Sequence, residues 1–277
     1  MAGVFRLEGR LIALAAAALL IAWSAPARAQ FSVNSPSVEQ GELDIETHGS
    51  FATGLPKAGG EDADTVRYGQ EVEIGYGVTS FWQAQLGMTL QKPDGLGFQA
   101  NSVDFINIFQ LAKVERWNAT FGLQAGVSLG IAQGEPDEVQ FGPLVQFGDE
   151  DSGLTLNGVF GKTFGPHRED GLGFEYAAQL KLPVRHGLGA GVEAFGDIGD
   201  IGRTAFDDTQ LRFGPALFFS FGEDKDKDRE GKGEDDEAKQ MKGAGKEPDI
   251  KSAIGLLFGA TDATPNLTVK WDLEVSF

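Results

Sequence analysis

Apolar and polar residues alternate at period two along most of the chain after residue 30. In residues 81–91, FWQAQLGMTLQ, apolar side chains hold the even positions and mostly polar ones the odd positions. Residues 117–131 and 174–182 repeat the pattern. This period indicates β-strands with one apolar and one polar face. The stretches exceed the roughly 5–6 residues of an average strand and reach the roughly 9–11 that a tilted membrane-spanning strand needs.

The alternation predicts twelve strands, and an even number places both chain ends on the same side of a barrel. Connections after the second, fourth, sixth and eighth strands are tight, whereas most of the others are longer, as in bacterial outer-membrane barrels. The tenth connection is long and the eleventh short, against this pattern, and a miscounted strand would produce the same effect. The predicted strands are 42–53, 65–77, 80–91, 98–112, 115–132, 136–148, 152–164, 171–183, 186–197, 208–221, 250–260 and 264–277.

The first 29 residues read as a cleaved signal peptide. Arg6 and Arg10 precede an uncharged apolar run, residues 11–23, and Ala27-Arg28-Ala29 supplies a small-x-small cleavage site. A transmembrane anchor is the alternative, but the run is short for about 30 Å of hydrocarbon. We therefore expect an exported protein whose residues 30–277 form one domain, located in the bacterial outer membrane.

Composition narrows the classes of function. The chain has no cysteine, which excludes a lipidated cysteine and a disulfide scaffold. The predicted leader holds three Arg and one Glu of the 23 basic and 41 acidic residues, so the remainder carries 20 and 40, a net charge of −20. Such acidity argues against nucleic acid as a partner and favours cations or a hydrated environment.

The segment 222–249 has mixed charge, several glycines and no aromatic residue, which predicts a disordered acidic loop. Asp224, Asp226 and Asp228 have the spacing of a calcium loop. Arg229 stands where that loop needs Gly, however, and no flanking helices are predicted, which disfavours calcium. We expect no metal site and no cofactor.

The fold class follows from which face is buried. If the apolar faces pointed inward, twelve long strands would need one common core, and no helix pattern offers a cover. If they point outward, each strand presents a lipid-facing band, with Tyr76, Trp82, Trp117, Trp271 and Phe277 near strand ends as an aromatic girdle. The sequence therefore predicts an all-β, transmembrane, antiparallel up-and-down barrel whose closure removes every strand edge.

Strand parity then identifies the inward residues around the closing seam, where the first, second and last strands meet. An acidic group is expected in the periplasmic half of the lumen, with Arg67 and Lys270 nearer the middle or the outer half. Two interpretations stay open: mutually paired, solvated side chains, or a cation-favouring constriction. The predicted lumen residues are acidic Glu42, Asp44, Glu46, Glu71, Glu73, Asp272 and Glu274, with basic or polar His48, Arg67 and Lys270.

An enzyme is the least favoured class. His48 and Ser50 resemble the His and Ser two residues apart on one strand of outer-membrane phospholipase A, another twelve-stranded barrel. Parity places both residues in the lumen, whereas the lipase needs its pair towards lipid. We therefore expect no catalytic residues.

Two stretches carry a family resemblance. Residues 71–86, EVEIGYGVTSFWQAQL, and the final hairpin, residues 258–277, resemble outer-membrane transporters grouped with the MetA pathway of phenol degradation. This resemblance implies a porin-like channel for small compounds, aromatic or apolar ones included; the charged seam fits a polar solute equally. Phe277, ending an alternating strand, is similar to the signal read by the barrel assembly machinery.

The predicted function is thus a passive outer-membrane channel or uptake protein for small molecules. Its expected partners are outer-membrane lipids, the barrel assembly machinery and a solute that the sequence does not identify. The alternative is a structural or adhesive barrel with a plugged lumen.

Overall fold

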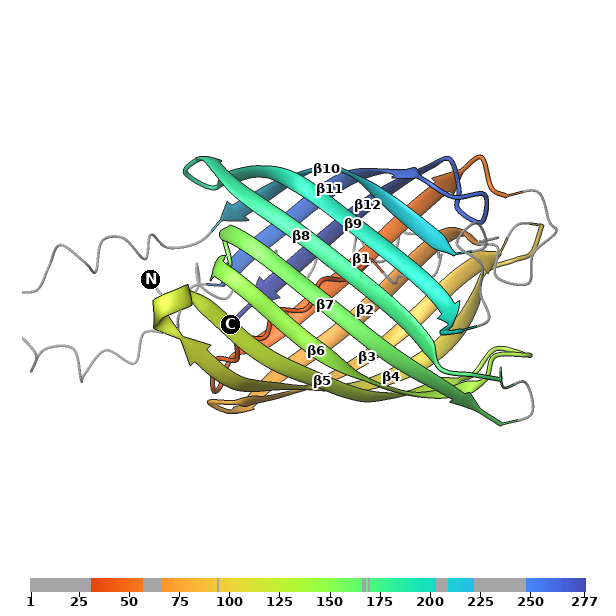
Figure 1. The fold of residues 1–277 in the computed structure, drawn as a ribbon, viewed down its shortest axis with the longest axis horizontal. Coiled ribbons are helices and arrows are strands. Elements are labelled where there is room, and N and C mark those ends of the chain that lie inside the picture. The colour runs from red at the N-terminus through yellow and green to blue at the C-terminus, as the bar shows by residue number, and fades with distance from the viewer. Residues whose placement is uncertain are drawn as a thin grey trace, which may run out of the picture.

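Twelve strands form one closed antiparallel barrel in the computed structural model (Figure 1). It describes residues 31–56, 66–93, 95–165, 168, 170–202, 209–221 and 248–277. Every strand pairs with its sequence neighbours, and β12 pairs with β1 to close the sheet. The strands are β1 Leu43–Thr53, β2 Val66–Thr79, β3 Trp82–Pro93, β4 Gln99–Val114, β5 Ala119–Gly130, β6 Asp137–Asp149, β7 Ser152–Phe164, β8 Gly173–Arg185, β9 Leu188–Asp200, β10 Gln210–Phe221, β11 Asp249–Gly259 and β12 Leu267–Ser276.

The predicted fold class and number of strands are confirmed, and the bounds differ from the prediction by a few residues. Among the described residues the helical element is a 3-10 turn, η1, Glu115–Trp117. None of the described residues forms a helix long and apolar enough to cross a membrane.

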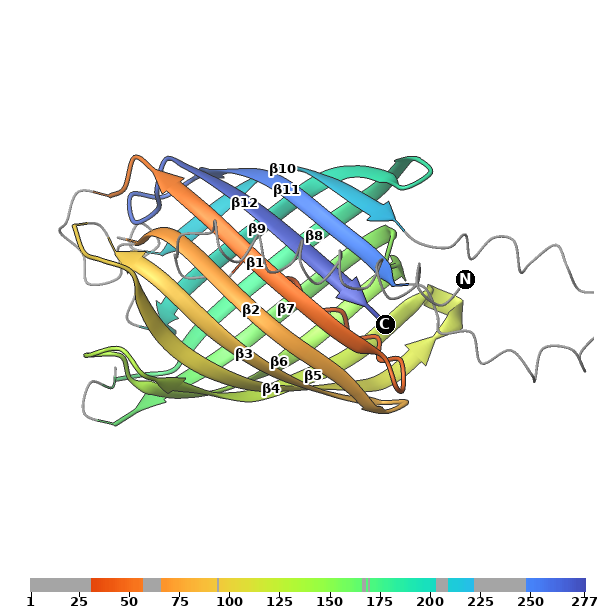
Figure 2. The same cartoon turned by 180° about the vertical axis from the view of Figure 1, so that it is seen from behind.

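The two rims differ in their connections. We call the rim at which the chain ends the near rim and the other the far rim (Figure 2). At the near rim, two residues join β2 to β3, β6 to β7 and β8 to β9, and four join β4 to β5. The long tenth connection, β10 to β11, also lies at the near rim, so a miscounted strand does not explain it. Its residues 222–247, most of the predicted disordered loop 222–249, lie outside the described residues, as does the predicted signal peptide, whereas Asp249 begins β11.

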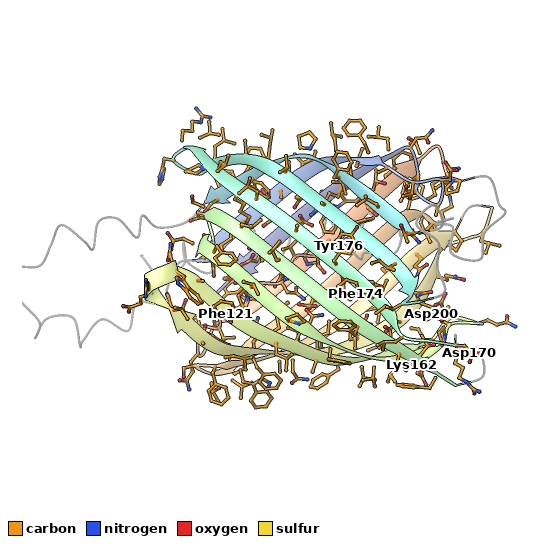
Figure 3. The ribbon with its side chains drawn as sticks, in the orientation of Figure 1. Phe121, Lys162, Asp170, Phe174, Tyr176 and Asp200 are labelled. Atoms are coloured by element: carbon orange, nitrogen blue, oxygen red, sulfur yellow. The ribbon has the colours of Figure 1, made fainter. Side chains whose placement is uncertain are left out.

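The outer wall is apolar. Large side chains that would be buried in a water-soluble protein point outward, with Leu86 56% and Val192 52% exposed. Figure 3 shows Phe174 and Tyr176 on this wall, with Lys162, Asp170 and Asp200 towards the far rim. Aromatic pairs lie towards both rims: Trp82–Phe109 and Trp117–Phe121 near one, Phe51–Tyr68 and Phe160–Phe174 near the other. Such paired belts are typical of membrane barrels.

Trp271 departs from the expected position at a strand end, because it lies in the middle of β12. Its indole covers Gly49, where any side chain would clash with the ring. Beside Gly49 on the same face, Gln70 donates to the Thr47 hydroxyl. This outward polar pair is therefore shielded rather than exposed.

Residues 31–40 run inside the barrel before the chain turns at Gly41 into β1 (Figure 2). We call this stretch the inner segment. Two small apolar clusters fix it: Phe31 and Val33 pack with Ala177, Phe195 and Leu257, and Val38 packs with Ile106, Ile108 and Leu144. The sequence analysis assigned the apolar faces to the outer wall and did not foresee these contacts inside the lumen.

Candidate functional site

The inner segment is not a strand, so its backbone polar groups need other partners. Side-chain amides of β7 and β4 provide some of them. Asn157 of β7 accepts from the Asn34 N–H at 2.8 Å and donates to the Asn34 carbonyl oxygen at 2.9 Å. Gln110 of β4 accepts from the Val38 N–H at 3.1 Å.

Two further amides bind side chains of the same segment. The Asn34 Nδ2 donates to Gln124 Oε1 of β5 at 3.0 Å, and the Ser35 hydroxyl donates to Gln146 Oε1 of β6 at 3.0 Å. Each such bond contributes about 1 kcal/mol net, because water can replace it. The inner segment is thus positioned by interactions that can be exchanged for water.

Phe31 is the aromatic residue of the segment, and its side chain is buried. The Arg212 guanidinium lies 4.8 Å from its ring centroid, and Phe195 meets it edge-on with centroids 5.3 Å apart. The Lys270 ammonium donates to the Phe31 carbonyl oxygen at 3.0 Å and lies 4.9 Å from the Phe195 centroid. Ring and carbonyl are therefore held by different groups of the wall.

Lys270 is the centre of a buried charge network. Its ammonium pairs with Glu193 at 3.0 Å and with Asp272 at 2.9 Å, and the Lys270 and Glu193 side chains are 1% and 0% exposed. Gln179 also donates to Glu193 Oε1 at 2.7 Å, whereas Glu193 Oε2 has no hydrogen-bond partner among the described residues. Removing one member would leave a buried charge uncompensated.

The inner segment lines two cavities, which we call the far cavity and the near cavity. The far cavity has a volume of about 500 Å³, is lined by Phe31, Asn34 and Arg212 at its floor, and reaches residues of the far rim. Its lining includes eight carboxylates, Glu71, Asp104, Glu135, Glu138, Asp170, Glu175, Asp197 and Asp200, with Arg212 as the one Lys or Arg of the described lining. A low-dielectric wall bearing this excess concentrates cations in the cavity.

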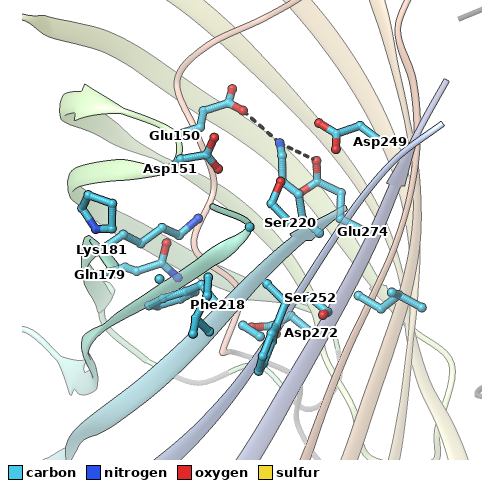
Figure 4. Close-up of a pocket in the computed structure, with 18 of the residues that line it drawn as sticks. Glu150, Asp151, Gln179, Lys181, Phe218, Ser220, Asp249, Ser252, Asp272 and Glu274 are labelled. Atoms are coloured by element: carbon cyan, nitrogen blue, oxygen red, sulfur yellow. Dashed lines mark hydrogen bonds and ion pairs between the residues drawn. The ribbon is translucent and has the colours of Figure 1, made fainter. Parts of the chain in front are cut away.

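The near cavity has a volume of about 470 Å³ and is bounded by Val33 of the inner segment. Lys251 of β11 pairs with Glu150 at 2.9 Å and with Glu274 at 3.1 Å, and dashed lines in Figure 4 mark the interactions of these two carboxylates. Lys181 of β8, three strands from β11, lies 5.2 Å from the Phe218 ring centroid. Acidic and basic side chains are mixed here, unlike in the far cavity.

The predicted acidic group is divided between the two cavities. Strand register places Glu46 directly beside Glu73 and Glu274. Glu46, Asp272 and Glu274 line the near cavity. Glu71, expected beside them, lines the far cavity instead.

The remaining predicted residues have varied positions. Asp44 accepts from Gln83 at 3.0 Å and is buried, and Glu73 is also buried. Lys270 lies between the cavities rather than within either. Glu42 and Arg67 lie at the near and far ends of the seam and are partly exposed.

His48 and Ser50 do not form a catalytic pair in this arrangement. His48 Nδ1 lies 3.0 Å from Asp272, and Nε2 lies 3.3 Å from Glu46, so both ring nitrogens face carboxylates. Ser50 is 1% exposed. No group of three or more His, Cys, Asp or Glu side chains suited to a metal is found in the described part of the chain.

Sequence reasoning missed the inner segment, and with it the amide residues that hold it. Residues 31–38, FSVNSPSV, are too short and too polar to show a period. Gly122 leaves room for the segment, because a Cβ at this position would lie 2.8 Å from Pro36. This close approach is visible only in three dimensions. Phe277 lies beside β1, donating its N–H to the Leu43 carbonyl oxygen at 3.0 Å.

No family model matches the chain, and no curated protein matches it by sequence. Among solved structures it is similar to the COG4313 outer membrane channel from Pseudomonas putida F1, with a TM-score of 0.55 and 11% identity over 87% of this chain and 97% of the other. The NanC porin follows with a TM-score of 0.49 and 8% identity over 84% and 98%. At the level of fold, the first likeness agrees with the resemblance noted from the sequence.

Proposed function

We propose that this protein is a passive channel of the bacterial outer membrane for small solutes, closed in the present state by its inner segment. One observation carries the proposal: cavities of about 500 and 470 Å³ lie inside an apolar-walled barrel, and both are lined by the inner segment, which is held partly through exchangeable hydrogen bonds. The near rim, which holds the start of β1, the end of β12 and the short turns, would face the periplasm.

Dimensions support a membrane location. Tyr68 and Tyr76 of β2 lie eight residues apart and project on the outer wall near opposite rims. At about 3.3 Å per residue and a tilt near 40°, they are about 20 Å apart along the barrel axis, close to the height of the apolar band of outer-membrane barrels. Export would require the predicted signal peptide, residues 1–29.

Cation selectivity is the test of the channel. Purified protein in planar bilayers should give single-channel currents with a preference for K⁺ over Cl⁻, because the far cavity concentrates cations. Glu71→Gln should lower the K⁺/Cl⁻ permeability ratio about twofold. Glu115→Gln is the matched control, since Glu115 is exposed in η1 at the near rim and lines neither cavity. Bilayers that stay silent with the folded protein and also with a folded variant lacking residues 31–38 would reject the proposal.

A structural barrel with a permanently plugged lumen is the second candidate, and the amide contacts of the inner segment are the observation that favours it. It differs from the channel in one measurable respect. Variants that loosen the segment should conduct if the protein is a channel with a removable barrier and remain silent if the barrel is filled. We propose no catalytic role for His48 or Ser50.

Phe277 is proposed as the contact to the barrel assembly machinery. Phe277→Ala should lower the amount of folded barrel in the outer membrane several-fold, because the side chain proposed as the contact is lost. The backbone hydrogen bond between Phe277 and Leu43 does not depend on that side chain, so the substitution leaves it in place. Leu43→Ala, at the paired position, is the control for a local effect on strand closure. Folded barrel is measured as the heat-modifiable band on gels, and equal amounts for Phe277→Ala and the unaltered chain would exclude this role.

A further inference from the structure

The wall around Phe31 has the form of a binding site for an aromatic compound. The Arg212 guanidinium faces the Phe31 ring and the Phe195 ring meets it edge-on. The Lys270 ammonium donates to the backbone carbonyl oxygen of the same residue. Both aromatic contacts are the geometries that stabilise a bound ring. Arg212 and Phe195 are each 3% exposed, and Leu257, which completes the enclosure, is 0% exposed.

These groups belong to a different part of the structure from the residue they hold. Phe195, Arg212, Leu257 and Lys270 project from β9, β10, β11 and β12, which are joined to each other by continuous backbone pairing. Phe31 belongs to the inner segment, whose uncharged hydrogen bonds to β4 and β7 contribute about 1 kcal/mol each. Because the wall strands are paired independently of the segment, we expect the wall groups to keep their positions if the segment leaves, which would vacate the ring site.

The charges at this site define the ligand further. Arg212 and Lys270 are two cations, and Glu193 and Asp272 are two carboxylates beside Lys270. A ligand that brought a charge of either sign would leave one charge unbalanced in a buried place, which is costly. Lys270 binds the carbonyl oxygen of Phe31. The carbon that carries this oxygen is the third from the ring, after Cβ and Cα.

We propose that the site occupied by Phe31 binds solutes in transit, namely small uncharged aromatic compounds with an acceptor oxygen on a short side chain, and that Phe31 occupies it in their place. Solutes reach it from the far rim, because Phe31 and Arg212 form part of the floor of the far cavity. That the bound solutes are in transit rests on the proposed channel function, whereas binding at the site does not depend on conduction.

The Phe31→Ala variant of the full chain tests the site, with 3-phenylpropanamide as the probe. This amide carries the ring and carbonyl of Phe31 at the same covalent spacing. Calorimetry in detergent micelles should show one probe bound per chain of Phe31→Ala, and at least about tenfold weaker binding to the unaltered protein, whose site is filled. Val38→Ala is the matched control, because Val38 packs in the other apolar cluster, with Ile106, Ile108 and Leu144, and its loss leaves the ring site occupied.

Two relatives of the probe separate the contributions of ring and oxygen. In Phe31→Ala, 3-cyclohexylpropanamide keeps size and carbonyl but loses the π face, and should bind about fivefold more weakly. The compound 3-phenylpropylamine keeps the ring but replaces the acceptor with a cation, and should also bind more weakly. Equal affinity for all three, or no binding of the amide to folded Phe31→Ala, would overturn the site.

A second pair of variants locates the binding. In the Phe31→Ala background, Arg212→Gln should remove the difference between phenyl and cyclohexyl amides, and Phe195→Leu should weaken the phenyl amide alone while preserving bulk. If Arg212→Gln fails to fold, Phe195→Leu carries the same test. An unchanged preference for the phenyl amide in the folded double variants places the binding elsewhere and overturns the proposal.

Conduction is recorded separately, so that the two proposals fail separately. In planar bilayers, 3-phenylpropanamide should reduce the K⁺ current of Phe31→Ala with the concentration dependence of its binding. Amide binding in a protein whose variants never conduct would reject the channel and retain the site. Conducting variants with no amide binding would retain the channel and reject the site.

Discussion

Deleting residues 31–38, with residues 1–30 joined directly to Glu39, should raise the single-channel conductance about three- to tenfold, because the segment separates the two cavities. Removal would merge the cavities and leave the amides of β4 to β7 to water, which can satisfy them. The conductance is measured in planar bilayers at fixed salt, with folding checked by the shift of the heat-modifiable band.

Ser37→Ala is the control for this deletion. Ser37 lies in the same segment, and its N–H donates to the Ser35 hydroxyl within the segment rather than to the wall. Its variant should conduct like the unaltered protein. A folded deletion variant with unchanged conductance would mean that wall side chains, not the inner segment, form the barrier.

The second large effect is on stability. Lys270→Met should lower the free energy of unfolding by about 3–5 kcal/mol, because Glu193 would remain buried without its cation. Unfolding by urea in lipid vesicles, followed by tryptophan fluorescence, measures the change. Lys251→Met is the matched control on the neighbouring strand: its partners Glu150 and Glu274 are 45% and 31% exposed, so its loss should cost about 1 kcal/mol or less.

The double variant Lys270→Met/Glu193→Gln distinguishes charge from packing. If the uncompensated carboxylate causes the loss, the second substitution should restore more than half of it, since Gln179 can still bind the uncharged amide. A double variant as unstable as Lys270→Met would instead assign the loss to the contacts of the Lys270 ammonium with the Phe195 ring and with the Phe31 carbonyl oxygen.

The barrel could be predicted because its rule is local. A strand shows alternate residues to its two faces, so Leu86 and Gln85 go to opposite sides wherever β3 lies in the molecule. Twelve such stretches, and the alternation of short and long connections, were enough to predict an up-and-down barrel. The final strand, ending at Phe277, was recognisable for the same reason, and it pairs with β1 as a closed wall demands.

The candidate site could be predicted only in part. Parity identified Glu46, Asp272 and Glu274 as inward, but not the height at which each lies relative to the barrier. Glu71 lies next to His48 in register and yet lines the far cavity, because the division of the lumen depends on a segment from another part of the chain. The roles of Gln110, Gln124, Gln146 and Asn157 were equally hidden, since an inward amide in a strand looks like any other polar residue.

The sequence by itself determined the strands, their faces and the acidity of the lumen, because these follow from the order of residues along each strand. The tertiary structure alone decided where residues 31–40 lie, which cavity each inward residue serves, and that Phe31 is held between Arg212, Phe195 and Lys270. The reason is physical: the contacts of Phe31 with these three residues join positions more than 150 apart in the sequence. No periodicity along the chain can predict a contact over such a separation.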